Sequence, residues 1–147
     1  MQNQIKTALS LLMVLALLAA CQPVKNEVKI TDNWVRATQQ GQEVGAAYMT
    51  LTSNTDTSLT SIETPVAGSV EIHSMSMDNG VMKMRMLEQL DLKANTPNQL
   101  APGGFHLMLF DLKKALKVGD SVHFSLHFKD AQHKETIIEL DSPIKAD

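Results

Sequence analysis

Methionine and histidine are the residues of this chain whose types and spacing could do chemistry. Six of the nine methionines lie between Met75 and Met108, and two histidines, His73 and His106, lie beside or within that stretch. Neutral thioethers are poor ligands for hard cations and for zinc, but they suit Cu(I), with imidazole as a compatible partner. A thioether has no acidic proton to lose and forms no disulfide, although it can oxidise to the sulfoxide. The pattern favours an exchangeable site for monovalent copper.

A β-hairpin would bring most of these side chains together. Asn79-Gly80 lies between two alternating runs and supplies the positive φ angles that a two-residue hairpin loop needs. With that loop, side chains directly opposed across the strands would have Cβ atoms about 4.5–5.5 Å apart, all on one face. The expected pairs are His73 with Met86, Met75 with Met84, and Met77 with Met82.

The simplest alternative is that these methionines only fill the core, which methionine does well. Val70 and Ile72 oppose this interpretation, because alternation puts them on the face opposite His73. We therefore expect the strand to change environment near His73, through a bulge or by leaving the body of the sheet. The methionine stripe would then lie at the end of the domain.

A third strand is expected to contribute two more donors. In residues 104–110, Phe105, Leu107 and Leu109 form an apolar face. His106 and Met108 alternate with them and point to the opposite face. If this strand lies beside the hairpin, two imidazoles and several thioethers converge.

The elements that must position these donors are short strands. Strand-like runs separated by turn signals recur along the chain, which is typical of an all-β antiparallel sandwich or barrel. The one possible helical piece, residues 111–116, is a single turn at most. In residues 121–128, His123 and His127 are expected on a solvated face, and His133 in a turn. The expected strands are 28–30, 34–37, 46–52, 58–62, 70–77, 81–90, 105–109, 121–128 and 136–140.

Length and composition limit the function classes. A chain of 147 residues with 44% hydrophobic and 20% charged residues predicts one folded domain rather than disorder. A formal net charge of −3 argues against a protein that binds nucleic acid through its phosphates.

The first residues indicate export. Lys6 precedes an apolar run that is too short to span a bilayer and has the length of a signal-peptide core. Leu18-Ala19-Ala20-Cys21 resembles the bacterial lipobox, so we expect a signal peptide over residues 1–20 and lipidation of Cys21. Residues 21–27 would form a tether and residues 28–147 the domain. The anchor would hold the protein at the periplasmic side of a bacterial membrane, and Gln22 points to the outer membrane. Any soft metal site must then lack thiolate, because Cys21 is the single cysteine.

One family resemblance covers nearly the whole exported part. His73, Met84, His106 and Met108 are separated by ten, twenty-one and one residues. This spacing resembles the H-x10-M-x21-H-x-M signature of the periplasmic PCu(A)C copper chaperones. The flanking segments 34–36, 45–49, 73–78, 80–85 and 102–104 are also similar to that family.

The resemblance implies a single-domain, cupredoxin-like antiparallel β-sandwich that binds one Cu(I) and catalyses no reaction. It implies delivery of copper to an acceptor protein, either a cytochrome c oxidase subunit carrying the copper A centre or another copper chaperone. Carried over position by position, the ligands are His73, Met84, His106 and Met108, with Met75 as an optional ligand. Trp34 and Arg36 are interpreted as structural. Met77, Met82 and Met86 lie outside the signature and are interpreted as packing residues or a reserve of soft donors.

Three other functions share some of these features. A copper-buffering or tolerance protein with no oxidase partner would use the same site. A copper redox protein of the blue-copper kind would need a cysteine thiolate in the fold, which the exported domain lacks. A structural lipoprotein would use its methionines only for packing.

Overall fold

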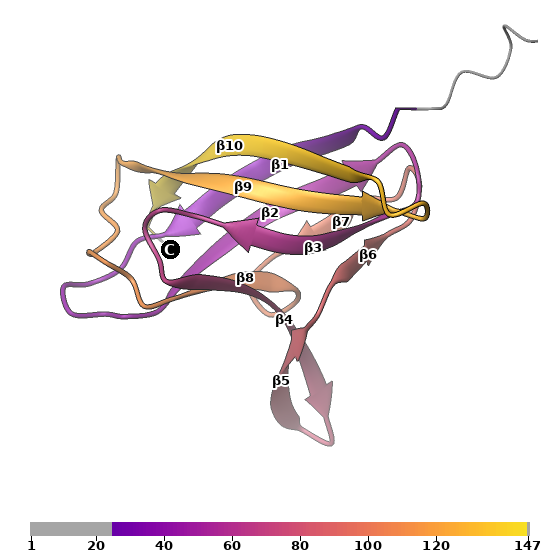
Figure 1. Cartoon of the computed structure of the whole chain (residues 1–147). Coiled ribbons are helices and arrows are strands. Elements are labelled where there is room, and N and C mark those ends of the chain that lie inside the picture. Colours follow the sequence, from indigo (N-terminus) through magenta and orange to yellow (C-terminus); the bar gives the residue numbers. More distant parts are fainter. Residues whose placement is uncertain (1–24, 147) are drawn as a thin grey trace, which may run out of the picture.

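The computed structural model describes residues 25–146 (Figure 1). Within that range the regular secondary structure is entirely β. No helix among those residues is long and apolar enough to cross a membrane. The strands are β1 (Val28–Arg36), β2 (Gly45–Ser53), β3 (Thr57–Glu63), β4 (Ser69–Asp78), β5 (Val81–Leu87), β6 (Leu90–Leu92), β7 (Asn98–Leu100), β8 (His106–Phe110), β9 (Ser121–Asp130) and β10 (Glu135–Lys145).

The strands form one folded sheet with two antiparallel halves. The order is β5-β4-β8-β2-β1-β10-β9-β3-β6, and β7 pairs with β2 off this path. The parallel pairing of β1 with β10, at Val35 and Ile144, joins the halves and is the one departure from antiparallel pairing among the described strands. In Figure 1 the half with β10, β9 and β3 lies in front of β1 and β2. This arrangement agrees with the expected sandwich.

The core lies between the two halves. Alternating residues of β9 are fully buried, as the sequence pattern predicts, and so are those of β8 and β2 that face them. Burial of such apolar side chains stabilises the fold by about 1.5–3 kcal/mol each. The largest of these buried side chains include Phe124, Phe128, Met49, Leu51, Leu107 and Leu109.

The last strand was expected over 136–140 but extends to Lys145, because its end pairs with β1. Two expected divisions between strands are also wrong. The run 81–90 is two strands, because β5 ends at Leu87 and β6, which begins at Leu90, pairs with β3 in the other half of the sheet. The runs 28–30 and 34–37 are one strand, β1, whose register shifts between Thr31 and Trp34. Asp32 has a positive φ of 53° at that bulge, so the turn-type residues there bend a strand and do not end it.

Two other local expectations also differ. Residues 111–116 form no helical turn, because the Leu112 and Lys113 N–H groups donate to Glu43 and Val66 carbonyls in other loops. β7, a three-residue strand after Pro97 that pairs with β2, was not among the expected strands. Proline at a strand start marks an edge strand as readily as a turn.

The expected change of environment near His73 is present. The pairing of β4 with β8 runs from Ser69 to His73 and stops there, whereas β4 continues to Asp78 with β5 alone. The outer part of the β4–β5 hairpin therefore projects from the body of the sheet (Figure 1). The methionine stripe lies on this projection and at its base.

His123 lies on the solvated face of β9, as expected, and pairs with two carboxylates of β10. Its Nδ1 is 2.9 Å from Asp141 Oδ1, and its Nε2 is 3.0 Å from Glu139 Oε2. The hydrogen bond with Asp141 contributes most, and together these carboxylates raise the pKa of His123 above its ordinary value.

This geometry predicts a pH-dependent contribution to stability. Because the folded-state pKa is raised, the contribution is fully present below the unfolded value of about 6.5 and is lost as pH rises through the folded value. We expect His123→Gln to lower the free energy of unfolding by more at roughly pH 6 than at roughly pH 8.5, because the two pH values lie on either side of the ordinary histidine pKa. Urea denaturation at the two pH values checks this. A His133→Asn variant in the β9–β10 turn is the control, and a pH-independent difference for His123→Gln would contradict the prediction.

Candidate metal centre

The β4–β5 hairpin has the register that the sequence predicts. His73 pairs with Met86, Met75 with Met84, and Met77 with Met82. Asn79 and Gly80 form the two-residue loop with φ angles of 51° and 79°, which is the type I′ pattern. The turn therefore places the methionines of both strands on one face.

The third strand lies beside this hairpin. On β8, His106 is the cross-strand partner of His73, and Met108 is the partner of Glu71. The two imidazole rings have centroids 5.9 Å apart and are tilted by 36°. The pairing of β4 with β8 thus joins the two histidines of the predicted site across a sequence separation of more than thirty residues.

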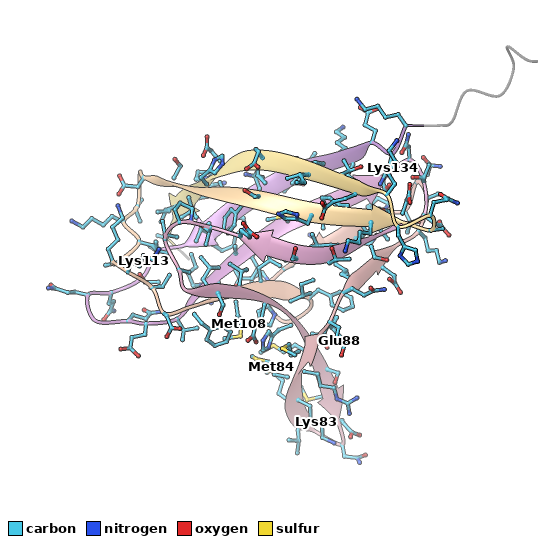
Figure 2. All side chains as sticks on the ribbon, in the orientation of Figure 1. Lys83, Met84, Glu88, Met108, Lys113 and Lys134 are labelled. Atoms are coloured by element: carbon cyan, nitrogen blue, oxygen red, sulfur yellow. The ribbon has the colours of Figure 1, made fainter. Side chains whose placement is uncertain are left out.

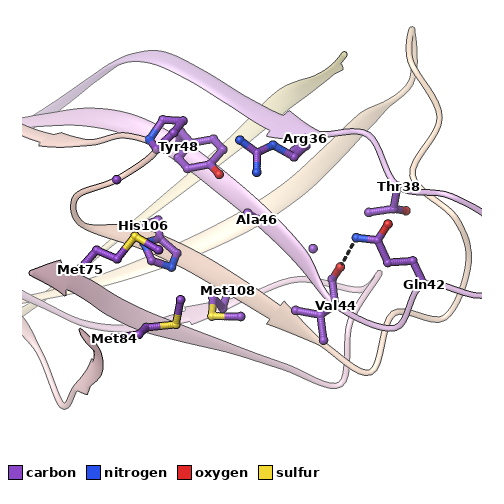
Figure 3. Close-up of a pocket in the computed structure, with 13 residues that line it drawn as sticks. Arg36, Thr38, Gln42, Val44, Ala46, Tyr48, Met75, Met84, His106 and Met108 are labelled. Carbon is purple, nitrogen blue, oxygen red and sulfur yellow. Dashed lines mark hydrogen bonds between the residues drawn. The ribbon is translucent and has the colours of Figure 1, made fainter. Parts of the chain in front are cut away.

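Four of the five predicted donors line one cavity of about 260 Å³: Met75, Met84, His106 and Met108. Figure 3 shows them on one side of that cavity, with the ends of Met84 and Met108 close to each other and Met75 next to the His106 ring. In Figure 2, Met84 and Met108 lie where the hairpin meets the body of the sheet. His106 is 6% exposed and Met84 is 46% exposed, so the cavity has a buried imidazole and an accessible thioether.

A tight turn before β8 fixes the orientation of His106. The Gly104 N–H donates to the Ala101 carbonyl at 3.0 Å, with Pro102 and a positive-φ Gly103 (85°) at the central positions of a type II turn. The Gly104 carbonyl accepts from His106 Nδ1 at 3.0 Å and from the Met75 backbone N–H at 3.2 Å. One carbonyl therefore ties β4 to the His106 ring. Because Nδ1 carries the donated proton, the lone pair of His106 is on Nε2.

His73 lies beside the cavity, and its ring is fixed by an acidic neighbour. Its Nε2 is 2.8 Å from Glu71 Oε2. A carboxylate only accepts, so Nε2 carries the proton and Nδ1 of the neutral ring has the lone pair. That Nδ1 is buried and has no hydrogen-bond partner among the described residues. A buried nitrogen without a partner is costly, and a metal ion would satisfy it.

The remaining predicted residues are distributed differently. Met77 and Met82 lie further out on the hairpin and are exposed. Met86 lines a separate cavity of about 210 Å³ that also includes Ile62 of β3. Phe105 does not continue the apolar face of β8 into the core, because it precedes the strand and is 39% exposed. Cys21 lies outside the described residues.

The opposite wall of the cavity was not predicted. Arg36 and Tyr48 line it, and the Arg36 guanidinium lies 5.4 Å from the centre of the Tyr48 ring, which also contacts Trp34. The contacts of Trp34 and Arg36 with the Tyr48 ring are compatible with the structural role expected for both residues. The β1–β2 register that brings Arg36 to this cavity depends on the β1 bulge, which the sequence does not locate.

The donor set defines the chemistry available. Three thioethers and the His106 imidazole line one accessible cavity, with the His73 imidazole beside it, and together these donors suit a soft monovalent ion. Residues 25–146 hold no cluster of three or more His, Cys, Asp and Glu side chains that could bind a metal. The orphaned Nδ1 of His73 and the free Nε2 lone pair of His106 fit such an ion.

A family model and a known protein both match most of this chain. The model of the LpqE-like lipoprotein family matches residues 28–140. Protein RP573 of Rickettsia prowazekii (strain Madrid E) is 33% identical over 129 residues, which covers 82% of this chain and 71% of that protein.

Solved structures show the same fold. The copper-bound PCuAC domain from PmoF2 superposes with a TM-score of 0.65 at 23% identity, covering 82% of this chain and 93% of that domain. The solution structure of Cu(I)-DR1885 from Deinococcus radiodurans has a TM-score of 0.63 at 29% identity, covering 88% of this chain and 83% of that one. The cupredoxin-like fold implied by the resemblance is thereby confirmed.

Proposed function

The chain belongs to the LpqE-like lipoprotein family, and from that premise we propose that it is an extracytoplasmic copper chaperone that binds one Cu(I) ion. The similar structures include a copper-bound PCuAC domain and a Cu(I)-bound protein. The observation that carries the proposal is the convergence of Met75, Met84, His106 and Met108 on one accessible cavity.

We assign the ligands from the donor geometry. Met84 and Met108 have their ends close to each other on one side of the cavity, and His106 presents Nε2 because its Nδ1 donates to the Gly104 carbonyl (Figure 3). His73 supplies the buried Nδ1 that otherwise has no partner among the described residues. Met75 lies next to His106 and is an additional thioether.

The proposed activity is metal transfer without catalysis. Met84 is nearly half exposed, so an acceptor can reach the ion while His106 still holds it from the buried side. Acceptor thiolates or imidazoles would replace the thioethers one at a time, and no free ion need be released. Thiolates bind Cu(I) more strongly than thioethers, which gives the transfer its direction.

The proposed acceptor is the copper A centre of cytochrome c oxidase, or another chaperone that supplies it. Lipidation of Cys21 would hold the domain at the periplasmic side of the membrane, with the outer membrane favoured by Gln22. The family name describes a lipoprotein, which supports this location.

Two measurements test the proposal. The full chain, purified in detergent, should compete for Cu(I) with a chromophoric chelator at one equivalent of strong binding, and an absence of competition would contradict copper binding. Deletion of the gene should lower oxidase activity at low external copper. Copper sensitivity with normal oxidase activity would instead support the buffering function.

The contact between Glu71 and His73 predicts a positioning effect. Replacing Glu71 by Leu removes the acceptor that fixes the His73 tautomer, and loss of such a partner typically costs about 10- to 100-fold in metal affinity. We expect Glu71→Leu to lower the Cu(I) affinity in that range. Glu71→Gln, which keeps an acceptor oxygen, should recover most of it.

Chelator competition checks both variants at one pH. Equal affinities for Glu71→Leu and wild type would show that His73 is not held through this contact or does not bind the ion.

A further inference from the structure

The tip of the β4–β5 hairpin carries two exposed methionines that the proposed site does not use. Met77 is 67% exposed and Met82 is 59% exposed, and they are direct cross-strand partners. Single exposed apolar side chains are common, but a directly opposed pair of unbranched thioethers at a projecting tip is not explained by packing.

The pair continues the line of donors. Side chains on one face of a strand recur every two residues, about 6.4–6.8 Å apart. Met77 and Met82 are therefore one step outward from Met75 and Met84, on the same face of the hairpin. Met75 and Met84 in turn line the cavity with His106.

The loop and one ion pair at the tip stabilise this register. Asn79 and Gly80 form the type I′ loop, and Lys83 on the opposite face donates to Asp78 across it. Alternation puts the Lys83 ammonium on the face away from Met77 and Met82. Only neutral thioethers and no cation therefore occupy the methionine face of the described tip.

We propose that Met77 and Met82 form a second, weaker site for monovalent copper that collects the ion and passes it inward. Two opposed thioethers are a soft, low-coordinate site. Without an imidazole or a buried wall, this outer site must bind more weakly than the inner one. The ion would move by exchange of one thioether at a time, from Met77 and Met82 to Met75 and Met84, and it remains Cu(I) throughout. This inference rests on the proposed function, because it adds an entry step to the same site.

Methionine methyl NMR of the full chain in detergent tests the proposal, with Ag(I) as a redox-stable monovalent probe. The first equivalent should shift the methyl signals of Met75, Met84 and Met108. A second equivalent should then shift those of Met77 and Met82. Unchanged Met77 and Met82 signals after the first site is saturated would overturn the outer site. If no methionine signal shifts at the first equivalent, the proposed function itself fails.

Variants test the transfer step. Met77→Leu/Met82→Leu keeps the volume and removes both thioethers, so it should lose the second equivalent and keep the affinity of the first. It should also take up Cu(I) more slowly from a Cu(I)–chelator complex. Met49→Leu, the same substitution in the buried core, is the matched control and should retain both equivalents. Uptake at the wild-type rate, or slowed uptake with the second equivalent retained, would overturn the proposal.

Discussion

The double variant Met84→Leu/Met108→Leu is expected to bind Cu(I) more than about 100-fold more weakly than wild type, since loss of an outer-shell partner alone costs about 10- to 100-fold. Leucine matches methionine in volume but has no lone pair to donate. The two thioethers come from strands that do not pair with each other, β5 and β8, and they meet at one cavity. Removing both leaves His106 and His73 with Met75 as the remaining thioether at the cavity.

Chelator competition measures this loss, and circular dichroism verifies that the variant is folded. Met49→Leu is the matched control, because Met49 is 1% exposed in the core and does not line the cavity. Wild-type affinity in the double variant would contradict the assignment of Met84 and Met108 as ligands.

Truncation of the core should have the largest effect on stability. Phe124 on β9 is completely buried between the two halves of the sheet. Removal of such an aromatic side chain leaves a cavity and typically costs about 3–5 kcal/mol. We expect Phe124→Ala to lose that amount of unfolding free energy, as measured by urea denaturation of the metal-free protein.

The same variant tests whether the stability of the fold and the Cu(I) affinity of the site are independent. Because Phe124 belongs to the half of the sheet that carries none of the donors, the folded fraction should keep its Cu(I) affinity. Phe105→Ala is the comparison: its side chain is partly exposed, and we expect a loss of about 1 kcal/mol or less. Equal losses for the two variants would contradict the described packing.

The hairpin was predictable because its determinants are local. Asn79-Gly80 admits few alternatives to a type I′ loop, and once the loop is fixed, the period of two decides every pair from Met77 to His73. The departure of the strand from the body of the sheet was also predictable, from the apolar side chains of Val70 and Ile72 on the face opposite His73.

The partners that hold the histidines could not be predicted from the sequence. Glu71 is two residues from His73, and Gly104 is two residues from His106, yet a pattern of residue types does not say which carbonyl or carboxylate each ring nitrogen meets. The prediction that Met84 converges with His106 and Met108 came from the family resemblance. No local pattern predicts it, because the pairing of β4 with β8 joins segments that are far apart in the sequence.

One boundary error arose where the chain leaves one half of the sheet for the other. From Val81 to Leu90 the alternation of residue types is interrupted only at Glu88-Gln89, with no glycine or proline there to mark the end of a strand. The break is set by tertiary pairing, because Leu90 meets Leu59 of β3.

Ligand counting by X-ray absorption on the Cu(I)-loaded full chain tests the central claim most directly. Soft donors from the hairpin and β8 are proposed to hold one monovalent copper ion together. We predict a first shell that contains both imidazole nitrogen and thioether sulfur, with a smaller sulfur contribution in Met84→Leu/Met108→Leu, where Met75 is the remaining thioether at the cavity. A shell of nitrogen and oxygen alone in the wild-type protein would contradict the account.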